Sequence, residues 1–331
     1  MRKGIFVGAI VYGVFLVTLG SPTFAEEAKK VEKKTFNLKP GGLVTVIGDN
    51  GYVRVKSWGK EQVELTMTKW AWDRSERRAQ RRLEEIEVDI NQSGDRLTIQ
   101  VLDTERQRHF NFFDLFDSDR WGHGWEETRV DFDLMVPREV DLDIENDEGE
   151  VEITGIKGDV SVEADEGEVN LRDVQFKDLR ITADEGEVTC EQVKGREGRL
   201  SINADEGRVR IEEAEVGDLQ VECDEGDILL TRAGLESFRL TTDEGDIEAD
   251  LDPTGRGRYQ MDADEGDVFV TLPKDASLTL DLETENGHIN SDFSLSVERQ
   301  EEGESAHGRL GKGEARLEIY TQEGEITLEE R

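Results

Sequence analysis

The sequence is poor in several residue types that mark common protein classes. Its 331 residues include only two Cys, five Pro and four His, and aromatic residues make up 7%. So few cysteines exclude a disulfide-dense domain, and so few prolines exclude a Pro-rich linker protein. Basic residues are also scarce, since 41 Lys and Arg face 78 Asp and Glu, which gives a formal net charge of −37. This charge argues against a nucleic-acid partner, because phosphate binding needs a basic surface.

Signatures of catalysis are missing as well. The four histidines show no metal-ligand spacing, and no Ser or Cys nucleophile motif is present. We therefore expect no enzyme activity, no catalytic residue and no cofactor-binding residue. Some parallel β-helices cleave polysaccharides, so a polysaccharide-active enzyme is kept as an alternative. The two cysteines, Cys190 and Cys223, are expected to be buried packing residues rather than a disulfide.

One long hydrophobic run is present, at the start of the chain. Arg2 and Lys3 precede an apolar stretch over residues 5–19, and small residues lead up to Ala25. This order predicts a signal peptide over residues 1–25, cleaved after Ala25. An uncleaved anchor is the alternative, because a spanning helix needs about 20 apolar residues. After cleavage we expect no membrane span and an exported protein that is periplasmic, on the cell surface or secreted.

The negative charge lies in one half of the chain. Residues 26–140 hold 20 basic and 23 acidic side chains, whereas residues 141–331 hold 19 basic and 55 acidic ones. This break predicts a boundary near residue 140. We expect a linker over residues 26–40, an N-terminal β cap over residues 41–140, and acidic repeats over residues 141–331.

The acidic half is periodic. The triplet Asp-Glu-Gly occurs seven times, with its glycine at positions 149, 167, 186, 207, 226, 245 and 266. Glu285-Asn286-Gly287 is a variant copy, and Gln322-Glu323-Gly324 resembles a last copy after an irregular insertion. A step of 18 to 21 residues is typical of stacked repeats.

Apolar residues alternate with polar ones around each glycine. Two residues after it stand Val151, Val169, Val188, Val209, Ile228, Ile247, Val268 and Ile289. Five residues before it stand Ile144, Val162, Ile181, Ile202, Val221, Leu240, Met261 and Leu282. Alternation with a period of two predicts two short strands per unit. Because one unit cannot bury its own apolar face, the sequence predicts an all-β fold: a parallel β-helix-like solenoid of two-strand coils, each about 19 residues long. An antiparallel array of hairpins is the alternative.

The first half has the features of a cap for this solenoid. Residues 43–55 resemble one coil around Asp49-Asn50-Gly51, and strands are expected near residues 63–67, 96–102 and 129–136. One short helix is expected from about residue 74 to 86. Between the last two strands lies an aromatic loop, which either folds over the cap or forms a partner-binding patch. The candidate partner-binding residues are Phe110, Phe112, Phe113, Phe116, Trp121 and Trp125.

Several short motifs add a family resemblance. These are Leu38-Lys39-Pro40-Gly41-Gly42, the Val136-Pro137 and Leu272-Pro273 strand entries, and the repeated Asp-Glu-Gly-x-Val units. With them the chain resembles the putative-adhesin family of secreted bacterial β-strand-repeat domains of unknown function, over nearly all of residues 36–331. The resemblance implies a β-solenoid at or beyond the cell envelope and supplies no catalytic residues. The long aromatic insertion is a departure from the family pattern.

Stacked units would align the acidic triplets into columns of carboxylates. Such columns should raise their carboxylate pKa values or recruit cations, and Ca²⁺ suits irregular oxygen sites. The candidate metal ligands are Asp165, Glu166, Asp184, Glu185, Asp205, Glu206, Asp224, Glu225, Asp243 and Glu244. The alternative is that Asp accepts backbone hydrogen bonds at the turn and Glu is only solvated.

The sequence therefore favours a non-enzymatic, adhesin-like or scaffold solenoid of the cell envelope. Its partner is expected to be an envelope protein or glycan, and its acidic corner is a candidate site for Ca²⁺. A further alternative is an envelope-stress or assembly accessory protein that acts through the aromatic loop.

Overall fold

The computed structural model describes residues 25–102, 127–253, 255–299 and 301–331. The chain forms two compact units, unit 1 (Met1–Glu150) and unit 2 (Val151–Arg331), and the boundary expected near residue 140 falls within unit 1. The expected signal peptide, apart from Ala25, and the aromatic loop lie outside the described residues. Within the described ranges, no helix has the length and apolar character needed to cross a membrane.

The described part of unit 1 is mostly β-structure. Its single helix is α1 (Glu76–Glu85), where the sequence predicts one. Its strands are β1 (Glu26–Asn37), β2 (Gly42–Ile47), β3 (Val53–Trp58), β4 (Gln62–Asp73), β5 (Glu87–Ser93), β6 (Arg96–Leu102), β7 (Glu127–Pro137) and β8 (Val140–Glu148).

Unit 1 combines a solenoid-like coil with antiparallel strands. Strand β2 lies between β6 and β8 and is parallel to both, and β3 is parallel to β7. Strand β4 pairs antiparallel with β7 on one side and with β1 on the other, while β5 pairs antiparallel with β6. Helix α1 packs Ala79 and Leu83 against Ala28 of β1 and Ala71 of β4. The antiparallel pairs cover strand edges in the way a cap does.

Residues 26–40 are not the linker that the sequence analysis expects. Strand β1 occupies Glu26–Asn37 and pairs with β4 along its full length of 12 residues. The hydrophobic pattern misses this strand because most of its side chains are charged and only Ala28 is buried. Lysines on an edge strand are a common device against edge-to-edge association.

Unit 2 contains the remaining strands. They are β9 (Val151–Thr154), β10 (Val160–Glu166), β11 (Val169–Arg172), β12 (Asp178–Glu185), β13 (Val188–Glu191), β14 (Lys194–Glu206), β15 (Val209–Glu212), β16 (Glu215–Glu225), β17 (Ile228–Glu244), β18 (Ile247–Leu251), β19 (Arg258–Glu265), β20 (Val268–Leu272), β21 (Leu278–Asn286), β22 (Ile289–Ser291), β23 (Ser296–Arg299), β24 (Glu304–Arg309), β25 (Ala315–Glu323) and β26 (Ile326–Glu330).

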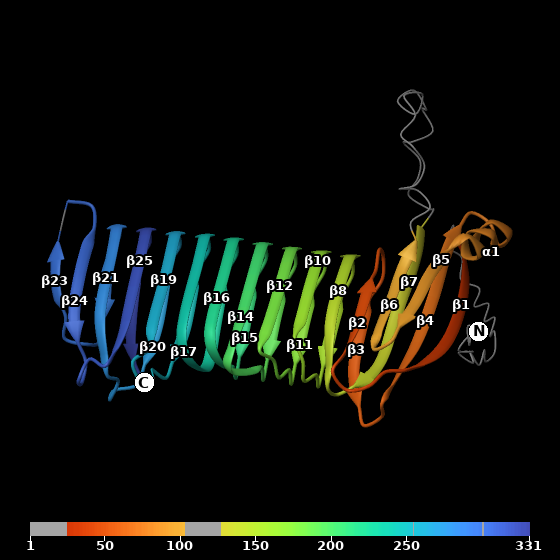
Figure 1. The fold of residues 1–331 in the computed structure, drawn as a ribbon. Coiled ribbons are helices and arrows are strands. Elements are labelled where there is room, and N and C mark those ends of the chain that lie inside the picture. The colour runs from red at the N-terminus through yellow and green to blue at the C-terminus, as the bar shows by residue number, and fades with distance from the viewer. Residues whose placement is uncertain (1–24, 103–126, 254, 300) are drawn as a thin grey trace. The chain divides into compact units, whose positions relative to one another are not determined.

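Successive coils of unit 2 stack in register, and Figure 1 shows their strands lying side by side. The strands that precede the Asp-Glu-Gly corner form one parallel ladder, here called ladder B, in which Val160 pairs with Leu179 and Leu179 with Leu200. The strands that follow the corner form ladder A, in which Val169 pairs with Val188. These parallel pairings confirm the predicted β-solenoid and contradict the antiparallel hairpin array.

The interior consists of the alternating apolar residues that the spacing predicts, with Val188, Ile202, Val209 and Ile228 all buried. A third, shorter parallel ladder closes the coils between Lys157 and Gly234, linking Gln175 with Lys157 and Lys194, Lys194 with Glu215, and Glu215 with Gly234. The bend before it holds non-glycine residues at φ between +51° and +55°. They are Asp173, Gln192, Glu213 and Arg232. This third side is not among the features predicted from the sequence.

The last coil does not stack in sequence order. Strand β25 pairs with β19 on one side and with β21 on the other, and β26 pairs in the same way with β20 and β22. The C-terminal coil is thus inserted between two coils that precede it in the chain, as Figure 1 shows for β25. Strand β24 then pairs antiparallel with β21, and β23 with β24.

Candidate functional site

The corner of unit 2 depends on its glycines. Gly186, Gly207 and Gly226 have φ of +128°, +125° and +154°, a region that L side chains rarely adopt. A Cβ atom at Gly207 would lie 2.1 Å from the carbonyl oxygen of Gly186, one coil away. The turn and the close approach of successive coils therefore both require glycine.

The corner places the candidate acidic residues in columns. Glu185 pairs in register with Glu166 and with Glu206, and the column continues through Glu225 and Glu244. Neighbouring strands lie about 4.8 Å apart, so the glutamates repeat at this spacing. All ten candidate residues are exposed, and none of their side chains has a hydrogen bond or ion pair with another described residue.

Alignment does not produce a chelating cluster. Over the described ranges, no three His, Cys, Asp or Glu side chains are grouped so that they could hold a metal ion. Calcium binding at this corner therefore stays a prediction.

Backbone hydrogen bonds at the corner are accepted by the residue after the glycine. Oδ1 of Asp227 accepts from the amide of Asp246 at 3.2 Å, and Oδ1 of Asp246 accepts from the amide of Asp267 at 2.8 Å. Asp267 continues the series by accepting from the amide of Glu325 at 2.7 Å. The side chains of the triplet aspartates Asp165, Asp184, Asp205, Asp224 and Asp243 accept no such hydrogen bond from a described residue. The available signal in the sequence is the change from glutamate after the glycine in the early coils to the shorter aspartate at positions 227, 246 and 267.

Arg208 interrupts the acidic residues at this same position. Its guanidinium lies 2.8 Å from the carboxylate of Asp227 in the next coil. The hydrogen bond from Arg208 keeps the pKa of Asp227 below its ordinary value of 3.8. The arginine therefore joins two coils where a glutamate would repel its neighbour.

Small side chains fill the inside of the corner three residues before each glycine. Where this residue is polar, it donates to the glycine carbonyl of the preceding coil: Thr242 to Gly226 at 3.1 Å and Cys223 to Gly207 at 3.4 Å. Cys190 and Cys223 are both free and buried, as predicted. Burial raises the pKa of Cys190 to about 12 and that of Cys223 to about 11, so both thiols stay protonated.

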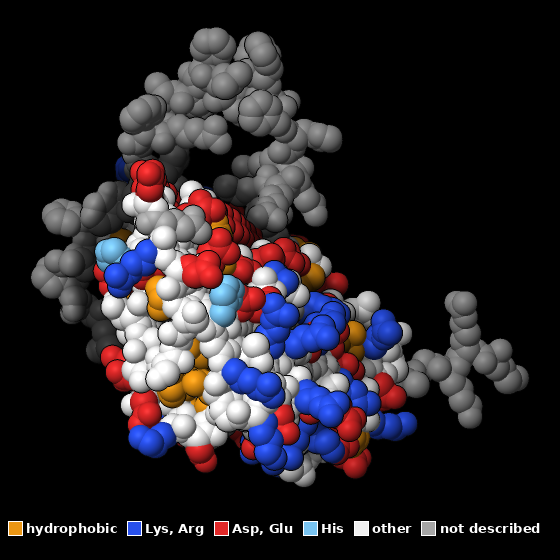
Figure 2. Space-filling view, turned by 90° about the vertical axis from the view of Figure 1, so that its left-hand side faces the viewer, with side chains coloured by type: hydrophobic (Ala, Val, Ile, Leu, Met, Phe, Trp, Pro, Cys, Tyr) orange, Lys and Arg blue, Asp and Glu red, His pale blue; other side chains and the backbone are white. Residues whose placement is uncertain are grey.

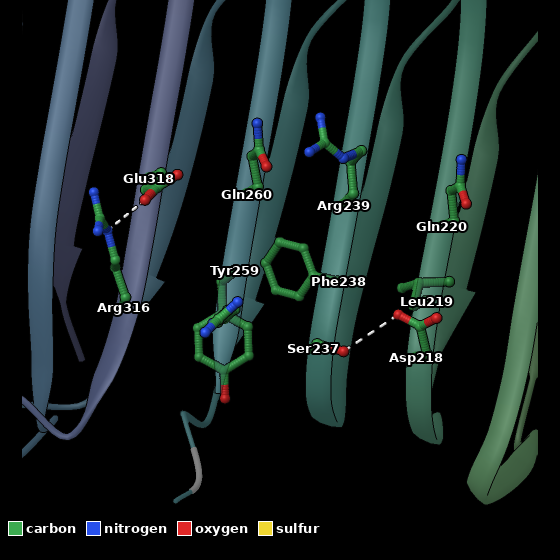
Figure 3. A pocket seen from close by; sticks show the side chains of 11 residues that line it. Asp218, Leu219, Gln220, Ser237, Phe238, Arg239, Tyr259, Gln260, Arg316 and Glu318 are labelled. Atoms are coloured by element: carbon green, nitrogen blue, oxygen red, sulfur yellow. Dashed lines mark hydrogen bonds and ion pairs between the residues drawn. The ribbon is translucent and has the colours of Figure 1, made fainter. Parts of the chain in front are cut away.

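An open polar groove lies on the outer face of ladder B and is drawn in Figure 3. Its volume is about 670 Å³. Two rows of outward side chains line it, and each row crosses β16, β17, β19 and β25. The rows are Asp218, Ser237, Arg258 and Arg316, and Gln220, Arg239, Gln260 and Glu318. The alternate residues Leu219, Phe238 and Tyr259 are buried beneath it, where Phe238 and Tyr259 stack with ring centroids 5.0 Å apart.

Most charged groups of this groove are already paired. Asp218 lies 3.0 Å from Arg199, Arg239 lies 3.3 Å from Asp262, and Arg316 contacts both Glu318 and Asp281. Ser237 donates a hydrogen bond to Asp218, and Gln260 donates one to Asp262. In contrast, the side chains of Arg258 and Gln220 make no hydrogen bond or ion pair with another described residue. The sequence analysis did not identify either residue.

The six aromatic candidate residues, from Phe110 to Trp125, lie outside the described residues, so the expected partner-binding patch stays a prediction. The structure shows a different aromatic group in unit 1. Trp70 and Trp72 stack with ring centroids 5.9 Å apart, and the Lys29 ammonium lies 3.8 Å from the Trp70 ring centre. The indole nitrogen of Trp70 donates to the buried carboxylate of Asp131 at 2.7 Å. The sequence signal for this group is the spacing of two residues between Trp70 and Trp72, which places both rings on one face of a strand.

Comparison with solved structures finds low sequence identity. A putative cell adhesion protein from Clostridium sporogenes shares 9% identity, covering 92% of this chain and 100% of its own, with a TM-score of 0.23. A putative adhesin from Bacteroides fragilis shares 10% identity, covering 91% of this chain and 98% of its own, with a TM-score of 0.44. No curated protein matches the sequence.

A family match covers most of the chain. The family described as Toastrack DUF4097 matches residues 52–329, which include most of unit 1 and nearly all of unit 2. This match confirms the resemblance to adhesin-like domains of unknown function. The chain therefore belongs to the Toastrack DUF4097 family.

Proposed function

We propose that the protein is an exported, non-enzymatic adhesin-like or scaffold module of the cell envelope. The observation that carries this proposal is the in-register stacking of unit 2, which repeats the same exposed side chains from coil to coil. Such a ladder converts a short sequence unit into an extended outer surface. An extended surface suits multipoint contact with a polymer or a neighbouring protein.

The acidic corner supports a role for cations in this function. Glutamates that repeat about every 4.8 Å along a ladder repel one another, and bound or nearby cations reduce that repulsion. Because the described carboxylates form no chelating group, the proposal is that Ca²⁺ gathers along the corner instead of occupying one coordinated site. Cations held in this way can bridge the protein to other anionic molecules of the envelope.

The test combines capture with turnover. The mature chain is immobilised and exposed to purified envelope polysaccharides, and both retained and released material are analysed. Retention without new cleavage products is the expected result. Release of shortened polysaccharide would overturn the proposal in favour of an enzyme, and the absence of any retention would contradict an adhesin-like role.

A deletion variant distinguishes the proposed function from an accessory protein that acts through the aromatic loop. Removal of residues 108–125 deletes the candidate aromatic loop and leaves ladders A and B of unit 2 intact in sequence. The proposal expects this variant to retain polysaccharide as the full chain does. Complete loss of capture with unchanged folding would instead favour an accessory protein that acts through the aromatic loop.

A further inference from the structure

The groove on ladder B contains two directly opposed basic residues, a pairing that occurs nowhere else among the described strand pairings of unit 2. Arg258 of β19 lies directly opposite Arg316 of β25. Elsewhere an arginine faces an acidic residue, as Arg199 faces Asp218, or a neutral polar one, as Arg239 faces Gln260. Like charges directly opposite each other destabilise a sheet. Arg316 is compensated by Asp281 and Glu318, but Arg258 has no acidic partner among the described residues.

The inserted C-terminal coil creates this arrangement. In sequence order the coil after β19 would be β21, which places Thr279 in the row of Arg258, but β25 lies there instead. The insertion brings Arg316 and Glu318 beside Arg258 and Gln260. The part of the groove formed by Arg316 and Glu318 therefore depends on the pairing of β19 with β25, two strands that are far apart in the sequence.

The groove offers polar contacts and no apolar anchor. Gln220 has a free amide, Ser237 has a hydroxyl, and Arg258 and Arg239 have exposed guanidinium groups. The apolar residues Leu219, Phe238 and Tyr259 are at most 4% exposed. A protein partner would be expected to need buried apolar or aromatic anchors, which the groove lacks. Figure 2 looks onto the end of unit 2 that carries β23 and β24 and not onto the groove, and there too hydrophobic side chains form only small, separate patches.

The available groups match a polymer that carries both hydroxyl and carboxylate groups. An unpaired guanidinium binds a carboxylate through two parallel hydrogen bonds. Amides and hydroxyls can donate to and accept from sugar hydroxyl groups. The two rows cross four strands that lie about 4.8 Å apart, so a linear chain along them can meet a polar or charged side chain on each strand.

Resting on the proposed function, we infer that this groove binds an acidic polysaccharide, with Arg258 contacting a uronic acid carboxylate and Gln220 contacting neighbouring hydroxyls. The inference adds a ligand class and a location to the adhesin-like role. It does not involve the acidic corner or a bound metal ion.

The test measures binding of uronic acid oligomers to the mature chain by titration calorimetry. The probes are oligogalacturonate, a neutral glucan of similar length, and polyglutamate as an acidic polypeptide. The variant R258Q removes the free guanidinium, and Q220A removes the free amide. The matched control is R180Q, because Arg180 is also an exposed arginine on ladder B but lies outside the groove and pairs with Asp178.

We expect oligogalacturonate to bind, the neutral glucan not to bind, and R258Q to weaken binding by about tenfold, the effect of losing one charged hydrogen-bonding partner. R180Q should stay within about twofold of the unchanged chain on the same scale. R258Q should also melt no lower than the unchanged chain, because it relieves repulsion with Arg316.

Three results would overturn the inference: equal effects of R258Q and R180Q, equal binding of the neutral glucan, or equal binding of polyglutamate. Absence of oligogalacturonate binding would overturn it as well. Retention of other envelope polysaccharides by the same preparation would then leave the proposed function standing, so the two failures are distinguishable.

Discussion

At Gly207 and its equivalents, backbone conformation and coil spacing both exclude a side chain. The residue needs a left-handed φ of +125°, and its Cα faces the carbonyl oxygen of Gly186. A side chain at this position would be accommodated only if the backbone of both coils moved. The recurring triplet is thus explained first by its glycine, and the acidic pair before it occupies exposed positions that tolerate charge.

Substituting this glycine should be strongly destabilising. We expect G207A to lower the free energy of unfolding of unit 2 by about 3 kcal/mol, from backbone strain together with the clash. The matched control is G234A, because a Cβ there meets no atom closer than 3.9 Å and the residue has no positive φ. G234A should change stability by less than about 1 kcal/mol. Urea unfolding of both variants measures the difference, and equal midpoints would contradict this explanation of the corner.

Glu304 ties the end of unit 2 together and should make its stability pH-dependent. Its buried carboxylate accepts from the amide of Ile289 at 3.0 Å and from Arg299 at 2.9 Å. The amide of Ile289, with Arg299 adding to it, holds the pKa of Glu304 below its ordinary value of 4.5. A lowered pKa in the folded state stabilises the fold fully above 4.5 and less as pH falls through the folded-state value.

The E304Q variant tests this dependence. At pH 7 it should unfold at lower urea concentration than the unchanged chain, since a charge-assisted hydrogen bond becomes a neutral one. The gap between the two should narrow as the pH drops from 5 to 3, because the native carboxylate then becomes protonated. A gap that stays constant over this range would show that Glu304 contributes no pH-dependent stability.

Among the elements, the inserted coil of β25 and β26 has the largest consequences. A C-terminal segment ordinarily frays because it has few neighbours. Here β25 is paired on both sides, by β19 and β21, and Leu317 and Ile319 are buried. Opening it requires breaking its pairings with both neighbouring strands at once, whereas β23 is a short, exposed strand that pairs only with β24 among the described strands.

Hydrogen exchange should reveal this difference. We expect the amides of Leu317 and Ile319 to exchange as slowly as those of central coils such as Ile202. The amides of β23 (Ser296–Arg299) should exchange much faster, because edge strands open locally at low free-energy cost. Exchange of Ile319 at the rate of β23 would contradict the insertion of the last coil.

The sequence predicts the strands of each coil but not the order in which the coils stack. Alternation around each glycine, from Val169 to Val268, identifies both strands of every coil because burial of one face imposes a period of two. The same local pattern at Leu317 and Ile319 fits any place in the stack, so it cannot show that β25 lies between β19 and β21. Consequently the pairing of Arg258 with Arg316, and the groove itself, could not be predicted. The third ladder was detectable, since Ile156, Val174 and Val193 stand seven residues after the glycine and are buried.

For the molecule as a whole, charge and stacking act against each other. Residues 141–331 carry 55 acidic and 19 basic side chains, and stacking aligns many of the acidic ones in exposed columns. Ion pairs between coils offset part of this repulsion, among them Arg208 with Asp227 and Arg196 with Glu215. The remainder should depend on the surrounding cations.

Millimolar Ca²⁺ should therefore raise the melting temperature of the full chain by a few degrees, and EDTA should reverse the rise. NaCl at the same ionic strength should give a smaller rise, because it screens charge equally but Na⁺ is attracted less strongly than Ca²⁺ to a row of carboxylates. Thermal unfolding followed by circular dichroism measures these changes. The absence of any shift with Ca²⁺ would contradict the proposed role of cations at the corner.

The stacking of coils in register can be measured most directly by spin-label distances. One label is placed at Glu166 and the second in turn at Glu225, Glu244, Glu265, Glu323 and Asn286, all exposed positions of the corner column. The native thiols of Cys190 and Cys223 are buried with raised pKa values, so they should not take up label. The account predicts distances that increase by about 4.8 Å per coil, with Glu323 nearer to Glu166 than Asn286 is, against their order in the chain. Distances that do not increase in even steps, or Asn286 lying nearer than Glu323, would contradict it.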